Sequence, residues 1–118
     1  MKSHYALFLD AYISAAFWSS SDDNDKPLEE TYTSGDISGE LMDQMIEDCG
    51  NFLAKAGLPA EKMVQAGHDF WLTRNGHGSG FWDRPEFYGV EKAQKLTTLA
   101  QSFGSADLYI GDDGRIYS

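Results

Sequence analysis

The most informative part of the sequence is residues 67–84, which read GHDFWLTRNGHGSGFWDR. Residues 68–74 are rich in aromatic and β-favouring side chains, which is typical of a strand. A glycine-rich turn follows at residues 75–80, and residues 81–83 are a candidate return strand. This pattern predicts a β-hairpin over residues 68–83.

Helical spacing of apolar residues covers most of the remaining chain. Helices or helical turns are predicted at residues 4–19, 38–56, 59–64 and 90–103. A second hairpin is predicted at residues 107–117, around a Gly-Asp-Asp-Gly turn. The predicted fold class is α+β, with three to four helices packed on a small antiparallel sheet built from the hairpins near 68–83 and 107–117. The 118 residues suit a single domain, with an acidic helical half at 1–57 and a second half at 58–118 that holds both hairpins.

The central stretch also carries a family resemblance. Residues 67–84 resemble the GHDFWLTRNGHGxGFWDR motif of a family of small bacteriophage, prophage and plasmid proteins. The Phe17-Trp18-Ser19-Ser20 segment with the acids after it, and residues 107–114, DLYIGDDG, are similar to the same family. The resemblance spans most of the chain and implies an origin in a mobile element, but it carries over no biochemical activity.

The polar side chains of residues 67–84 have two interpretations. In the first, His68, Asp69, His77 and Asp83 are ligands of a metal-dependent enzyme, and Arg74 holds an anionic substrate. Their spacing matches no established metal motif, so we assign no catalytic residue, no metal and no cofactor. In the second, the aromatic side chains form a cross-strand cluster and the polar ones orient turns and caps. The residues of possible function are His68, Asp69, Trp71, Arg74, Asn75, His77, Trp82, Asp83 and Arg84.

The net charge of −10 is unevenly distributed along the chain. Residues 1–50 hold 11 acidic and 2 basic side chains, a net of −9, whereas residues 51–118 hold 8 acidic and 7 basic ones, a net of −1. An acidic surface repels phosphate backbones and anionic lipids, so we expect no direct binding of nucleic acid or membrane. The candidate partner-binding residues are Asp22, Asp23, Asp25, Glu29, Glu30, Glu40, Asp43 and Glu47.

This acidic stretch also has two interpretations. It is either a solvated surface that contributes solubility, or an array of carboxylates presented to a basic groove of another protein. Glu40, Asp43 and Glu47 are spaced i, i+3 and i+7, which places them together on the exposed side of a helix. Such positions are about 5–6 Å apart at Cβ, a scale comparable to phosphate spacing, so the array can act as a nucleic-acid mimic.

The lone cysteine and the N-terminal segment indicate the compartment. Cys49 is the only cysteine, which excludes an internal disulfide, and its place in an apolar helical stripe predicts a buried thiol. Asp10 interrupts the apolar run between Tyr5 and Trp18, which disfavours a signal peptide. We therefore expect a cytoplasmic protein, located in the host cell if the resemblance holds.

The leading functional hypothesis is a small accessory protein that binds a basic host or phage protein through its acidic surface. An inhibitor of a host defence or DNA-handling protein is the form that the mobile-element resemblance suggests. One alternative is a small metal-dependent enzyme centred on His68, Asp69, His77 and Asp83, and another is a virion-associated structural component. The sequence does not indicate the oligomeric state.

Overall fold

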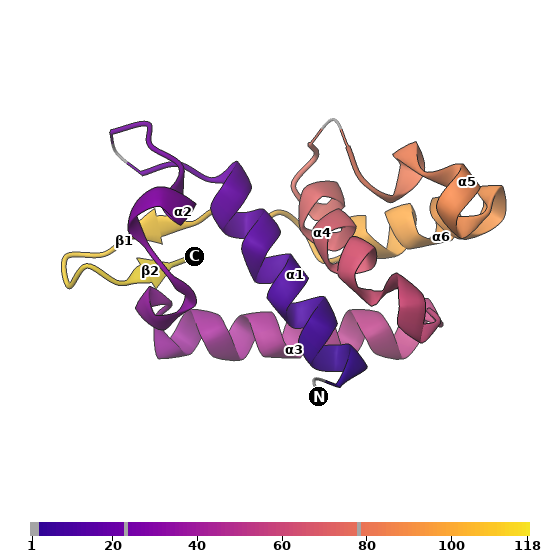
Figure 1. Cartoon of the computed structure of the whole chain (residues 1–118), viewed down its shortest axis with the longest axis horizontal. Coiled ribbons are helices and arrows are strands. Elements are labelled where there is room, and N and C mark those ends of the chain that lie inside the picture. The colour runs from indigo at the N-terminus through magenta and orange to yellow at the C-terminus, as the bar shows by residue number, and fades with distance from the viewer. Residues whose placement is uncertain (1–2, 23, 78) are drawn as a thin grey trace.

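The computed structural model describes residues 3–22, 24–77 and 79–118 and is built mainly from helices (Figure 1). The described residues form six α-helices: α1 His4–Ser19, α2 Leu28–Thr31, α3 Gly39–Ala56, α4 Met63–Arg74, α5 Pro85–Tyr88 and α6 Val90–Gln101. Short 3-10 turns lie at Ser34–Asp36 (η1), Ala60–Lys62 (η2) and Phe81–Asp83 (η3). The only sheet in the described part of the chain is the antiparallel pair β1 Tyr109–Ile110 and β2 Ile116–Tyr117. The predicted α+β fold, with helices packed on a sheet, is therefore wrong.

The predicted hairpin at residues 68–83 is the source of that error. Residues 69–74 are all buried and lie in α4, and the predicted return strand is the 3-10 turn η3. A helix that is buried around most of its circumference shows no polar face, so its apolar run cannot be distinguished from a buried strand by periodicity. The aromatic and β-branched side chains follow the burial rather than an intrinsic strand preference.

The Asn75-Gly76 pair ends α4 instead of turning a hairpin. The amide of Gly76 donates to the carbonyl of Thr73 at 3.2 Å, and the amide of His77 donates to the carbonyl of Leu72 at 3.0 Å. Gly76 has a φ of 71°. This combination is a Schellman motif, in which a glycine in the left-handed region satisfies the last helical carbonyls. The same dipeptide that favours a hairpin turn therefore serves here as a helix stop.

The other helix predictions are confirmed. Ser3 caps α1 through the amide of Ala6, and Ser38 caps α3 through the amide of Leu41. Gly57 ends α3 in the left-handed conformation. The predicted C-terminal helix and the hairpin at 107–117 are also present, although each strand has only two residues. In the described part of the chain, no helix is long and apolar enough to cross a membrane.

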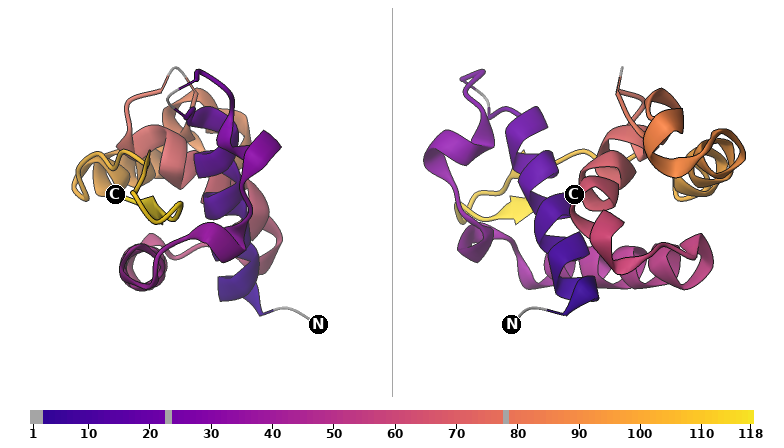
Figure 2. Two further views of the ribbon diagram at one scale, coloured as in Figure 1. Left: turned by 90° about the vertical axis from the view of Figure 1, so that its left-hand side faces the viewer. Right: turned by 45° about the vertical axis from the view of Figure 1, so that its right-hand side comes forward.

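The crossing of α1 and α4 forms the centre of the molecule (Figure 2). A Cβ on Gly67 would lie 2.3 Å from the carbonyl oxygen of Phe8, so only glycine allows the two helices to approach this closely. The rings of Phe52 and Phe70 stack beside this crossing with centroids 4.3 Å apart, and Phe81 stacks on Phe52 at 5.5 Å. The apolar core is therefore an aromatic cluster between helices, and not the predicted cross-strand cluster.

Candidate functional site

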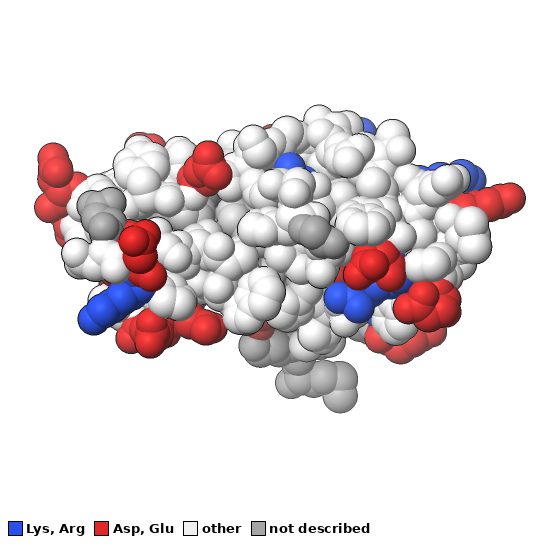
Figure 3. Space-filling model, turned by 90° about the horizontal axis from the view of Figure 1, so that it is seen from above, with Lys and Arg blue, Asp and Glu red and all other residues white. Residues whose placement is uncertain are grey.

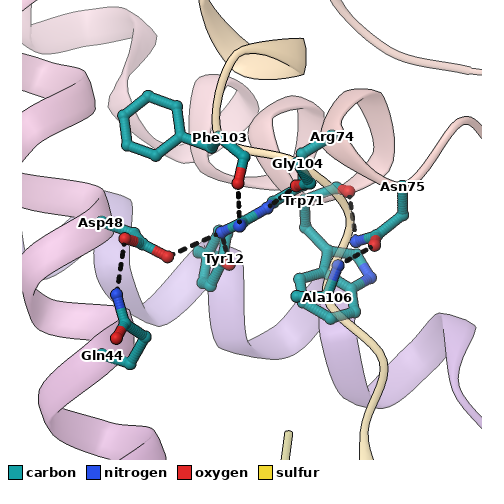
Figure 4. Close-up of polar contacts among 9 residues, drawn as sticks. All are labelled: Tyr12, Gln44, Asp48, Trp71, Arg74, Asn75, Phe103, Gly104 and Ala106. Carbon is teal, nitrogen blue, oxygen red and sulfur yellow. Dashed lines mark hydrogen bonds and ion pairs between the residues drawn. The ribbon is translucent and has the colours of Figure 1, made fainter.

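The Arg74 side chain makes four hydrogen bonds to three separate parts of the chain (Figure 4). It is 5% exposed and lies at the C-terminal end of α4. Its Nη1 donates to the Asp48 carboxylate and to the Tyr12 hydroxyl, each at 2.9 Å. Its Nε donates to the carbonyl of Gly104 at 2.8 Å, and its Nη2 donates to the carbonyl of Phe103 at 3.1 Å. One guanidinium thus joins α1, α3 and α4 to the segment that follows α6.

The electrostatics of this cluster are those of a structural ion pair. Burial opposes the charge on Arg74, but the Tyr12 and Asp48 side chains outweigh it and raise the pKa of the guanidinium. Burial also raises the pKa of the Tyr12 hydroxyl, which stays protonated. These shifts keep Arg74 charged and Tyr12 protonated, the states in which the hydrogen bonds between them and to Asp48 form.

Asp69 is the second buried charge of the stretch and is fully enclosed. Both carboxylate oxygens accept from Nε of Arg84 at 3.1 Å, and one accepts from the Tyr88 hydroxyl at 2.7 Å. Gln65, one turn earlier on α4, donates to Asp69 at 3.1 Å. Burial and the negative charge of Asp69 raise the pKa of Tyr88, so its hydroxyl remains a donor. Asp69 therefore ties α5 to α4 and is not available as a metal ligand.

The remaining polar groups at the end of α4 hold neighbouring segments in place. The indole Nε1 of Trp71 donates to the hydroxyl of Ser19 at 2.8 Å, which links α4 to the end of α1. The Asn75 side chain accepts from the amide of Ala106 at 2.7 Å and donates to the carbonyl of Trp71 at 2.9 Å. The Thr73 hydroxyl accepts from the amide of Phe81 at 3.0 Å and closes the loop after α4.

The described residues of the alternative metal-dependent site, His68, Asp69, His77 and Asp83, do not form a group that could hold a metal ion. His68 is half-buried, and His77 and Asp83 are exposed, while Asp69 is engaged by Arg84. Among the residues that the structure describes, no group of three or more His, Cys, Asp or Glu side chains could hold a metal ion. The side chains of the motif mostly stabilise the fold; the exception among its aromatic residues is Trp82, which is 51% exposed.

Most of the predicted acidic residues that the structure describes lie toward one end of the long axis. Figure 1 places α2, the loop before it, the β1–β2 hairpin and the start of α3 at this end, which we call the acidic end. Five of the eight predicted contact residues are exposed in these segments: Asp25, Glu29, Glu30, Glu40 and Asp43; Glu47 is exposed as well, but it lies halfway along α3. Asp22 is half-buried and accepts from the amides of Asn24 and Lys26, and Asp23 lies outside the described residues.

The acidic end has two separate sides. Figures 1 and 2 show α2 beside α1 and the start of α3 below it, so the acidic residues of this end come from separate elements. Seen from above, acidic side chains gather toward the two ends of the molecule, and the middle of that face is mostly uncharged (Figure 3). Glu40, Asp43 and Glu47 lie on the side of α3 opposite its buried residues, as predicted.

The fold brings to the acidic end two further carboxylates that were not among the candidate contact residues. Asp112 and Asp113 lie in the β1–β2 turn, which reaches the acidic end because the amide of Ser38 donates to the carbonyl of Ile116 at 2.9 Å. The Tyr117 hydroxyl and the Arg115 amide donate to Asp113 and lower the pKa of its carboxyl. The Asp-Asp pair was visible in the sequence, but the pairing of Ile116 with the residues just before α3, which brings the turn to this end, is a long-range contact that no local signal marks.

No protein-family model, curated protein or solved structure matches this chain. The resemblance of residues 67–84 to bacteriophage and plasmid proteins therefore stays an expectation. The function has to be inferred from the charges and contacts of the chain itself.

Proposed function

We propose that this protein is a binding module that engages a basic partner protein through its acidic end. The observation that carries the proposal is the row of exposed carboxylates Glu40, Asp43 and Glu47 on one side of α3. Complementary charge accelerates association and selects partners, which is the main use of such a surface. On the family resemblance, the partner is a host defence or DNA-handling protein.

The carboxylates of the row are not neutralised within the described part of the chain. The ion pairs between described residues join Arg74 to Asp48 and Arg84 to Asp69, and neither involves the row. Uncompensated like charges on one helix destabilise it by a few tenths of a kcal/mol per pair. A basic partner would remove this repulsion on binding and add its own attraction.

The spacing of the row suits a groove that normally holds nucleic acid. Asp43 and Glu47 are one helical turn apart, about 5–6 Å at Cβ. A nuclease or repressor groove presents Lys and Arg side chains at positions set by phosphates of similar spacing. The proposed role is therefore occlusion of such a groove, with the carboxylates in the place of phosphates.

The experiment is affinity capture from infected host cells by two triple variants that lose the same charge. The test variant is Glu40→Gln, Asp43→Asn and Glu47→Gln, and the control is Glu61→Gln, Glu86→Gln and Glu91→Gln, all exposed positions outside the acidic end. We expect the test variant to lose a basic protein that the wild type and the control both retain at low salt. Equal capture by both variants would refute the proposal.

A further inference from the structure

A groove runs between α3 and the C-terminal segment, beside the carboxylate row. It consists of two adjoining cavities of about 240 and 280 Å³ that share Leu41, Gln44 and Ser118 in their walls. Figure 1 places β2 above the start of α3, and Glu40 from α3 and Tyr117 from β2 both line the smaller cavity. The parallel bridge between Ile37 and Ile116 holds the two walls together.

Three polar side chains along one wall of the groove come from one ridge of α3. Glu40, Gln44 and Asp48 are spaced i, i+4 and i+8, so they follow one another along the wall. Gln44 donates to Asp48 at 2.9 Å, and Arg74 pairs with the other oxygen of Asp48. The Asp48 carboxylate in the inner half of the groove therefore already has hydrogen-bond and ion-pair partners within the chain. The carboxylate that remains available for a ligand is that of Glu40, in the outer half.

Aromatic rings lie beside that carboxylate. The ring of Tyr117 lines the outer cavity together with Glu40. Tyr109 stacks on Tyr117 with centroids 5.8 Å apart and is 57% exposed. Tyr117 itself is half-buried. A carboxylate next to an aromatic ring is a combination that binds organic cations, because the ring quadrupole and the negative charge both attract them.

We propose that this groove receives an arginine side chain of the basic partner. The guanidinium pairs with Glu40 and stacks against Tyr117, and the methylene stem lies along Leu41. Arginine fits better than lysine because its plane stacks on rings and its fork pairs with a carboxylate through two N–H groups. The inference rests on the proposed function, since it places one contact of the basic partner within the acidic end.

The test uses a fluorescein-labelled nona-arginine peptide as probe, with nona-lysine for comparison, and anisotropy titrations at low salt. Glu40→Gln and Glu47→Gln each remove one charge from the same helix, but only Glu40 lines the groove. We expect Glu40→Gln to weaken nona-arginine binding about fivefold and Glu47→Gln to weaken it less than about twofold. Nona-lysine should bind more weakly than nona-arginine to the wild type.

A second pair of variants leaves the charge unchanged. Gln44→Trp fills the groove, whereas Asn51→Trp places the same ring on an exposed position of α3 outside it. Only Gln44→Trp should weaken nona-arginine binding, by about fivefold or more. All four positions are exposed, so we expect each variant to be folded. Circular dichroism melts check this.

Two results would overturn this inference and leave the proposed function standing. The first is equal weakening by Glu40→Gln and Glu47→Gln, and the second is unchanged binding in Gln44→Trp; either means that the peptide meets a diffuse acidic surface. Failure of wild type to bind nona-arginine at low salt overturns the inference as well. The proposed function is judged separately, by the capture of a cellular partner by the two triple variants.

Discussion

Replacement of Arg74 by Met tests whether the 67–84 stretch is a structural unit. Met keeps much of the apolar stem, which packs where the guanidinium lies 5.5 Å from the centroid of the Phe70 ring. It removes all four hydrogen bonds of the guanidinium, to Asp48, Tyr12 and the carbonyls of Phe103 and Gly104. The change therefore isolates the polar role of the side chain from its packing.

The expected loss of unfolding free energy follows from these contacts. Breaking a buried ion pair by removing one partner costs about 3–5 kcal/mol, because the other charge stays behind. The Asp48 side chain is 15% exposed, so water can reach part of it, and we expect a loss near the lower limit, about 3 kcal/mol. For a chain of this length, about 3 kcal/mol lowers Tm by roughly 12 °C.

Urea denaturation followed by circular dichroism measures this loss. Arg115→Met is the matched control, because Arg115 is exposed and should change the unfolding free energy by less than about 0.5 kcal/mol. The double variant Arg74→Met with Asp48→Leu should recover part of the loss, since no charge is then left without its partner. A loss below about 1 kcal/mol in Arg74→Met would refute the structural role.

Three further predictions concern packing, the thiol and the hairpin. Gly67→Ala should lower the unfolding free energy by about 1–3 kcal/mol in urea denaturation, because its Cβ meets the carbonyl of Phe8; an unchanged midpoint would contradict the close crossing. Cys49 is fully buried and burial raises its pKa, so a thiol reagent should label it only after unfolding, and rapid labelling of the native protein would oppose this. Tyr117→Phe removes a donor to the Asp113 carboxylate, so the lowered pKa of Asp113 should rise toward 3.8 in an NMR titration. The hydrogen bond stabilises the folded state above that pH, and this stabilisation is lost as acid protonates Asp113. An unchanged pKa of Asp113 in the variant would exclude the contact.

The elements with end signals could be predicted from the sequence. α1 and α3 begin at capping serines, and α3 ends at Gly57, all of which depend on neighbours a few residues away. The exposed side of α3 could also be predicted from the sequence, because the helix has one buried and one polar side. Local chemistry and helical period were sufficient in these cases.

The features of the fold that could not be predicted from the sequence depend on contacts between residues far apart in the chain. α4 is buried around most of its surface, so its sequence lacks the polar face that marks a helix. The pairing of Arg74 with Asp48, 26 residues apart, is set by packing and not by local spacing. The same holds for the acidic end, where the β1–β2 turn joins α3 from the other end of the chain. Several residues of possible function in 67–84, among them Asp69, Trp71 and Arg74, are hydrogen-bonded within the fold, and the candidate contact surface is made of exposed carboxylates.

In the proposed function, the carboxylates of α3 bind a basic partner by charge. The most direct test is the dissociation constant of the captured partner, measured over a series of salt concentrations for the wild type and both triple variants. We predict a steep loss of affinity with salt for the wild type and the control, and a weaker, flatter dependence for Glu40→Gln, Asp43→Asn and Glu47→Gln. The same affinity and the same salt dependence in all three proteins would contradict the claim.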